Sequence, residues 1–193
     1  MRFKVNYRKK KQPGSMSGRK GIAEMTLFCY ISIILGIFFG ELRIKNFIEK
    51  SAPDSPGAPE TPEAGQTRNH VAVPSSIWKN RILIRRYHNK GAMLNLGQHR
   101  SSAVAVLSVA LCLLMTAAFV LSLGQRGNAL LRTGLSFLLG GAFSNTYDRL
   151  KRKYVVDYFS FHVKWAPLSR IVFNLSDFCI MAGALVAVLG TPD

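Results

Sequence analysis

Two aspartates, Asp157 and Asp177, are the residues of this sequence whose type and placement best suit them to chemistry. Asp157 lies in the connection between two long apolar segments, and Asp177 lies about six residues into the second of them, in the run FNLSD. A carboxylate inside an apolar span is energetically costly, so it marks a candidate functional site. Two carboxylates that meet there share one proton, which is how aspartic proteases hydrolyse amide bonds.

The chemistry follows from the repulsion between two like charges. Carboxylates a few ångströms apart do not both ionise, so one keeps a proton at neutral pH. The ionised group takes a proton from a water that attacks a peptide carbonyl, and the protonated group hydrogen-bonds the carbonyl oxygen. Spacing alone leaves two other roles open. These are a structural ion pair with Arg132, Lys151 or Arg152, and a place in an ion or proton pathway.

More polar side chains flank the two aspartates in the sequence. Asn145, Asp148 and Arg149 end the third apolar segment, and Asn174 precedes Asp177 by three residues. A spacing of three places both residues of a pair on one helix face. We therefore expect these groups to converge with the aspartates at one membrane face. The asparagines would orient the carboxylates or the substrate, and Arg149 would pair with Asp148.

The composition points to a basic membrane protein. The chain has 193 residues, of which 48% are hydrophobic, and it carries 26 Lys+Arg against 10 Asp+Glu, a net charge of +16. In a soluble protein this positive charge would indicate that the protein binds nucleic acid. Here the apolar residues form long runs, so we predict contact with anionic membrane lipids and no nucleic-acid partner. No group of cysteines or histidines has metal-ligand spacing, so we predict no metal and no cofactor.

Four apolar segments are candidates for crossing a bilayer: about 21–41, 102–124, 128–147 and 171–190. They predict an all-α membrane protein with one four-helix domain over residues 21–190. The run Gly-Gly-Ala at 140–142 predicts close helix packing in the third segment.

Two further segments lie between the first and second spans. Residues 51–69 are a proline-rich insertion that we expect to be disordered. Residues 77–87 alternate as a strand, residues 89–91 are a turn signal, and an apolar run resumes at 92. The segment 77–95 therefore predicts a small extracytoplasmic β hairpin at the membrane surface.

The ends of the chain predict its orientation. Residues 1–20 form a basic tail with eight Lys/Arg and no acidic residue, which predicts a cytoplasmic location. Four spans then place both termini in the cytoplasm and the candidate site near the outer face. The connections 42–100 and 148–170 together hold sixteen Lys/Arg, but long loops translocate largely regardless of charge.

Three ordered segments resemble the signature blocks of the lipoprotein signal peptidase (signal peptidase II) family. Residues 140–149 (GGAFSNTYDR), 154–158 (YVVDY) and 173–177 (FNLSD) match the blocks GGAxxNxxDR, VVDF and FNxAD. Residues 89–94 (NKGAML) are similar to a further NxGAAF segment. The resemblance covers about residues 22–190. It implies a protein of the bacterial cytoplasmic (inner) membrane, with four spans and both termini in the cytoplasm.

The resemblance also implies roles. Asp157 and Asp177 would be the catalytic dyad of an aspartic endopeptidase. Substrate-binding or site-supporting roles would fall to Asn89, Gly91, Asn145, Asp148, Arg149, Asn174, Glu41 and Lys45. The partners would be prolipoprotein signal peptides with a lipobox, cut just before a diacylglyceryl-modified cysteine, with no metal or cofactor. We further expect a monomer surrounded by membrane lipids.

The sequence departs from the family pattern at several positions. Glu41 replaces an aspartate, Tyr158 replaces phenylalanine, and Ser176 replaces alanine, while Met93 and Leu94 replace alanine and phenylalanine. These changes predict a divergent member. The main alternative is a catalytically idle or repurposed relative that binds lipidated peptides without cutting them. A small proton- or ion-coupled membrane protein is a third possibility.

Overall fold

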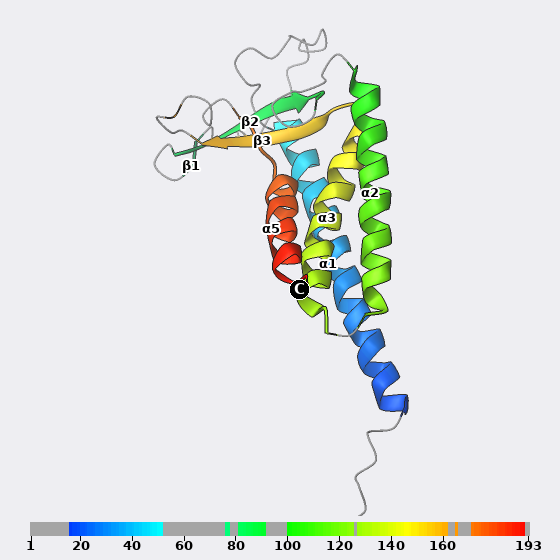
Figure 1. The fold of residues 1–193 in the computed structure, drawn as a ribbon. Helices are drawn as coiled ribbons and strands as arrows, with labels where there is room; N and C mark the ends of the chain where they lie inside the picture. The colour runs from blue at the N-terminus through cyan, green and yellow to red at the C-terminus, as the bar shows by residue number, and fades with distance from the viewer. Residues whose placement is uncertain are drawn as a thin grey trace, which may run out of the picture.

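The computed structural model describes residues 16–51, 76–77, 81–91, 100–125, 127–161, 165 and 171–191. Four helices and three strands make up this described part of the chain (Figure 1). In chain order they are α1 (Met16–Ser51), β1 (Ser76–Ile77), β2 (Ile82–Asn89), α2 (Ser101–Leu123), α3 (Ala129–Lys151), β3 (Val155–Phe161) and α5 (Leu175–Leu189). Most of the predicted basic tail and of the proline-rich insertion lies outside the described residues.

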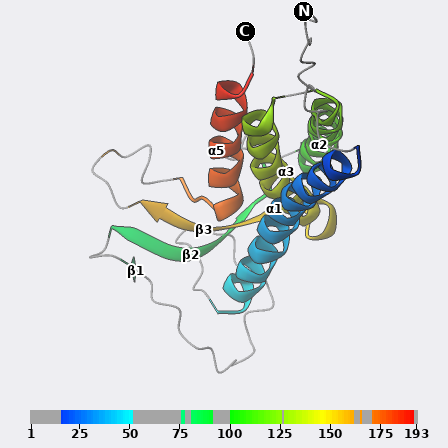
Figure 2. The same cartoon turned by 90° about the horizontal axis from the view of Figure 1, so that it is seen from below.

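The helices form a bundle in which α3 packs against α1, α2 and α5 (Figure 2). Its buried apolar side chains are Tyr30, Phe119, Leu135, Leu139 and Ala187. Each of the four predicted apolar segments is confirmed as a helix. The start of α1 and the end of α5 lie at one end of the bundle, and the sheet lies at the other end (Figure 1).

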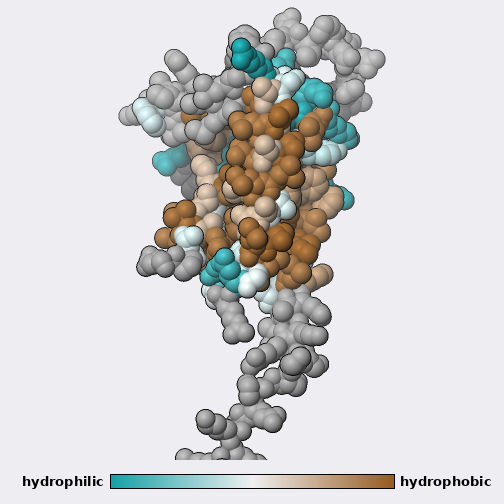
Figure 3. All heavy atoms as spheres, turned by 45° about the vertical axis from the view of Figure 1, so that its right-hand side comes forward, coloured by the Kyte–Doolittle hydropathy of each residue, from teal (hydrophilic) through white to brown (hydrophobic). Residues whose placement is uncertain are grey.

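The face of the bundle seen in Figure 3 is apolar over its middle. Helix α2 alone exposes Val106, Leu107, Leu111, Leu113, Leu114, Val120 and Leu121. Two helices, α1 over Met25–Ser51 and α2, are long and apolar enough to cross a membrane, while α5 is apolar but has 15 residues. Length and composition therefore support two of the four predicted spans.

Small residues let the helices approach closely, as the sequence predicted. A Cβ atom on Gly140 would lie 2.8 Å from Cβ of Ile37 in α1, and one on Gly141 would lie 2.5 Å from the carbonyl oxygen of Ser176 in α5. Because these distances are shorter than normal van der Waals contact, only glycine fits there. The two adjacent glycines thus allow α3 to pack closely against α1 and α5.

Two helix boundaries differ from the prediction. Helix α1 continues to Ser51 instead of ending near residue 41, because Glu41, Lys45 and Ile48 recur on one face and are all buried. Helix α5 begins at Leu175, four residues after the predicted start at 171, so the placement of Asp177 about six residues into the helix was wrong. Asp177 lies in the first turn of α5.

The three strands form one antiparallel sheet in the order β1-β2-β3. The sequence predicted a strand over 77–87, which overlaps β2, but paired it with the residues after the turn at 89–91, and residues 92–99 lie outside the described ones. The long partner of β2 is β3, a strand that the sequence did not predict. This pairing joins segments about seventy residues apart and sets Tyr87 opposite Asp157.

Candidate active site

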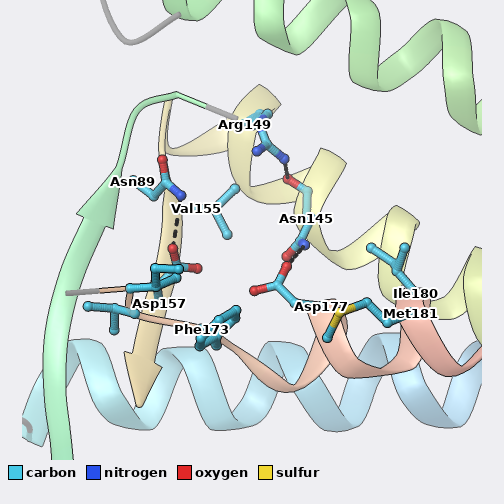
Figure 4. Close-up of a pocket in the computed structure, with 11 residues that line it drawn as sticks. Asn89, Asn145, Arg149, Val155, Asp157, Phe173, Asp177, Ile180 and Met181 are labelled. Carbon is cyan, nitrogen blue, oxygen red and sulfur yellow. Dashed lines mark hydrogen bonds between the residues drawn. The ribbon is translucent and has the colours of Figure 1, made fainter. Parts of the chain in front are cut away.

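Asp157 and Asp177 lie on the walls of one pocket where β3, α3 and α5 meet (Figure 4). Asp157 comes from the middle of β3 and Asp177 from the first turn of α5. The pocket is lined by Asn89, Asn145, Arg149, Val155, Asp157, Ile171, Val172, Phe173, Asp177, Ile180 and Met181. The polar residues lie toward the sheet, and Ile180 and Met181 extend the pocket along α5 as an apolar wall.

The carboxylate of Asp157 is buried and held by two asparagines. Its Oδ1 accepts a hydrogen bond from Nδ2 of Asn174 at 2.6 Å, and its Oδ2 accepts one from Nδ2 of Asn89 at 3.0 Å. Asn89 reaches Asp157 diagonally across the β2–β3 ladder, where it is paired with Val155. Asn89 therefore lies beside Asp157, and its role in binding substrate or supporting the site stays a prediction.

The carboxylate of Asp177 is fixed by its own helix terminus and by α3. Its Oδ2 accepts from the backbone nitrogen of Asn174 at 3.0 Å, while the Asp177 nitrogen donates to Oδ1 of Asn174 at 3.1 Å. This reciprocal pair is a capping box, which satisfies backbone donors that a helix start leaves free. The other oxygen, Oδ1, accepts from Nδ2 of Asn145 at 3.0 Å.

The environment of Asp157 favours its protonated form. Burial, and next the negative charge of Asp177, raise the pKa of Asp157 to about 7, although hydrogen bonds from Asn89 and Asn174 oppose the shift. Asp157 therefore holds a proton for a large part of the time near neutral pH. A pocket with one protonated and one ionised carboxyl group supports general acid–base chemistry.

A buried charge cluster lies behind the pocket. The ammonium of Lys45 lies 3.1 Å from a carboxylate oxygen of Asp148 and 2.8 Å from Oδ1 of Asn145, and its distance to Glu41 is 3.9 Å. Asp148 also pairs with Arg152 at 3.2 Å. Because Lys45 contacts Asn145 directly, this cluster supports the residue that holds Asp177.

The predicted pair of Arg149 with Asp148 was wrong. Arg149 instead donates to the carbonyl oxygens of Asn145 and Gly91, at 3.4 Å and 3.1 Å. Successive residues of a helix point about 100° apart, so Asp148 faces Lys45 on α1 while Arg149 faces the pocket. Arg149 thereby ties α3 to the segment after β2.

The basic residues considered as ion-pair partners of the aspartates have other contacts. Arg132 donates to the carbonyl oxygens of Ser122 and Gln125 at the other end of α3. Lys151 donates to the hydroxyl of Tyr147, and Arg152 pairs with Asp148. These contacts disfavour a simple structural ion pair as the reason for two aspartates in one pocket.

Tyr158 is a residue whose contacts the sequence pattern did not predict. Its hydroxyl donates to Oε2 of Glu41 at 3.0 Å and accepts from the backbone nitrogen of Leu175 at 3.0 Å. Glu41 Oε1 accepts from the Ser176 nitrogen at 3.3 Å. Three departures from the family pattern, Glu41, Tyr158 and Ser176, are therefore neighbours in space, which one sequence does not reveal.

The fold resembles that of known membrane enzymes. Two solved structures, described as bacterial membrane enzyme structures obtained by the in meso method, align with TM-scores of 0.58. The alignments cover 83% of this chain and 85% and 90% of those chains, at 15% and 16% sequence identity. At this identity the likeness concerns the fold.

The family model for signal peptidase (SPase) II matches residues 33–191. The chain therefore belongs to the signal peptidase II family, and it is a membrane protein. It is 34% identical over 117 residues to a lipoprotein signal peptidase of Clostridium acetobutylicum, covering 58% of this chain and 71% of that relative. It is 29% identical over 163 residues to one of Allorhizobium ampelinum, covering 82% and 86%. Other relatives, such as that of Mesorhizobium japonicum, are covered over 61% of their length.

Proposed function

We propose that this protein is an aspartic endopeptidase that removes signal peptides from prolipoproteins, cleaving before a cysteine that carries diacylglycerol. The observation that carries the proposal is the convergence of Asp157 and Asp177 in one pocket, in a chain of the signal peptidase II family. The peptidase domain spans about residues 21–190. The hydrogen bonds to both carboxylates support a preorganised site rather than an idle remnant.

In this mechanism the pair holds one proton, and we place it on Asp157, the carboxyl whose pKa is raised to about 7 by burial and by Asp177. Asp177 lies at the start of α5, where the helix dipole stabilises negative charge. Asp177 takes a proton from water, and the water oxygen bonds to the scissile carbonyl carbon while Asp157 hydrogen-bonds the carbonyl oxygen. The proton held by Asp177 then passes to the leaving nitrogen as the C–N bond breaks.

The lining of the pocket supports a substrate that is apolar beside the cleaved bond. Val155, Phe173, Ile180 and Met181 face the same space as the two aspartates. Met181 is half-exposed on the outer surface of α5, so the pocket continues into the apolar belt of the bundle. A lipobox with leucine and small residues before a lipidated cysteine matches this arrangement, and Arg149 and Asn145 would contact its backbone.

We also propose that all four helices cross the bacterial cytoplasmic membrane. The exposed apolar side chains of the bundle support this, as does the packing of α3 against both long apolar helices and of α5 against α3. Both termini would face the cytoplasm. The sheet lies at the opposite end of the bundle (Figure 1), so the sheet and the pocket beside β3 would lie near the outer face. The protein would act as a monomer surrounded by lipids.

The test is cleavage of a synthetic lipobox peptide whose cysteine carries diacylglycerol, by the full chain purified in detergent. We expect the parent to cut before the lipidated cysteine, and Asp157→Asn and Asp177→Asn each to lose at least about 100-fold in rate, because each removes a proton-transfer group. Glu49→Gln is the matched control, since Glu49 contacts His88 and Tyr154 outside the pocket. Mass spectrometry of the products gives the position of the cut.

Two results would overturn the proposal. Full activity in either aspartate variant would show that Asp157 and Asp177 do not act together as a catalytic dyad. A folded parent that binds the peptide without cutting it would indicate the repurposed relative instead.

A further inference from the structure

Tyr158 follows Asp157 in β3 but lies outside the pocket lining. Successive side chains of a strand point to opposite faces of the sheet, so the ring of Tyr158 faces away from the carboxyl group of Asp157. It is buried against Ile48 and Val156. Whatever Tyr158 does for the site, it does through other residues.

The hydroxyl of Tyr158 completes the capping of α5. The first backbone N–H groups of a helix have no partner within the helix. In α5 the N–H of Leu175 donates to the Tyr158 hydroxyl at 3.0 Å, and that of Ser176 donates to Glu41 at 3.3 Å. The third, of Asp177, donates to the Asn174 side chain. Two of the three acceptors thus come from other elements, β3 and α1.

The direction of these hydrogen bonds is fixed. The Leu175 nitrogen is a donor only, so the phenol oxygen accepts there and its own hydrogen points at Oε2 of Glu41, 3.0 Å away. Burial, and next the charge of Glu41, raise the pKa of Tyr158, so the phenol keeps this hydrogen. One hydroxyl therefore links α1, β3 and the first turn of α5.

We infer that Tyr158 is a positioning residue: with Glu41 it holds the turn that carries Asp177 against the strand that carries Asp157, and so sets the separation of the two carboxyl groups. The inference rests on the proposed function for its effect on catalysis. The hydrogen-bonded link itself is measurable without any activity.

The first test is Tyr158→Phe in the purified full chain, which keeps the ring and removes only the oxygen. We expect kcat on the lipidated peptide to fall about tenfold or more with KM nearly unchanged, because small misplacements of reacting groups cost rate. We also expect a narrower bell-shaped pH profile of kcat/KM, since two carboxyl groups that move apart titrate more independently. A loss of folded protein alone would lower the rate without changing the profile.

Tyr30→Phe is the matched control. Tyr30 is also buried, but it packs on Phe119 in the bundle core, and among the described residues its hydroxyl contacts the carbonyl oxygen of Ala129 at 3.5 Å. We expect parent activity and an unaltered pH profile. Glu41→Gln is a second probe, because Tyr158 and the Ser176 nitrogen donate to different oxygens of Glu41, and in glutamine one of these two positions is an NH₂ group that cannot accept. The double variant should lose no more than the worse single variant, as expected for two groups in one link.

Amide hydrogen exchange at Leu175 and Ser176 tests the link directly. Exchange should be at least about tenfold faster in Tyr158→Phe and unchanged in Tyr30→Phe, because the Leu175 N–H loses its acceptor. Unchanged exchange, multiplicative losses in the double variant, or a parent-like kcat and pH profile would each overturn the inference. A parent that fails to cleave counts against the proposed function, while the exchange result still decides whether Tyr158 holds the turn.

Discussion

At the scale of residues, three asparagines donate hydrogen bonds to the two carboxylates. The side-chain oxygen of each asparagine accepts a hydrogen bond from another group, which fixes the orientation of its amide. The side-chain oxygen of Asn89 accepts from the Gly91 nitrogen at 3.0 Å, and that of Asn145 accepts from Lys45 at 2.8 Å. Asn174 accepts from the Asp177 nitrogen in the same way. Since the oxygens are occupied, the NH₂ groups must face the carboxylates. The pocket is therefore built to receive negative charge in one defined geometry.

This geometry predicts the pH dependence of cleavage. With one proton shared by the pair, kcat/KM should fall above about pH 7, because the pKa of Asp157 is raised to about 7 and the acid form is then lost. Initial rates between about pH 5 and pH 9 measure this limb. A rate that stays level up to about pH 9 would contradict a proton held on Asp157.

Asn89→Ala provides the complementary variant for the pH profile. The amide of Asn89 donates to Asp157 at 3.0 Å and so stabilises its charged form. Removing it should move the alkaline limb to higher pH, whatever happens to the absolute rate. A shift to lower pH would mean that the limb belongs to another group.

At the scale of elements, the contact of α3 with α5 sets where Asp177 lies. Gly141→Ala should slow cleavage about tenfold or more and lower the thermal midpoint, because the new Cβ would lie 2.5 Å from the Ser176 carbonyl oxygen, one residue before Asp177. Gly36→Ala is the matched control, since a Cβ on Gly36 of α1 meets nothing within 4 Å. Peptide cleavage and thermal unfolding in detergent measure both variants. Equal effects of the two changes would contradict this account.

At the scale of the whole molecule, the sheet and the start of α1 lie at opposite ends of the bundle (Figure 1). The proposed orientation predicts that a cysteine at Lys90, after β2, is labelled by a membrane-impermeant maleimide in intact cells. A cysteine at Gln125, between α2 and α3, should be labelled only after lysis. Both positions are exposed, so access to the reagent is matched.

The background for this labelling needs the three native cysteines, Cys29, Cys112 and Cys179, replaced by alanine. The reverse labelling pattern would invert the orientation. Labelling of both positions in intact cells would contradict the proposal that the pocket and the start of α1 lie on opposite faces of the membrane.

Much of this architecture was predictable from local patterns. The apolar runs predicted four helices because a buried or lipid-facing helix is apolar over its length, and that signal is contained in consecutive residues. The strand β3 (VVDYFSF) was missed although it is rich in β-branched and aromatic residues. Its partner β2 lies far away in the sequence, and nothing in either segment alone indicates that they pair.

The sequence by itself identified the two aspartates of the pocket and the three asparagines that contact them, since all five were recognisable from their type, spacing and family resemblance. Only the tertiary structure decided how they are held. It directs Arg149 away from Asp148, places Asp177 in the first turn of α5, and lets Tyr158 and Glu41 cap that turn. The physical reason is that hydrogen bonds between distant segments depend on the relative placement of α1, β3 and α5, which packing of the whole chain fixes.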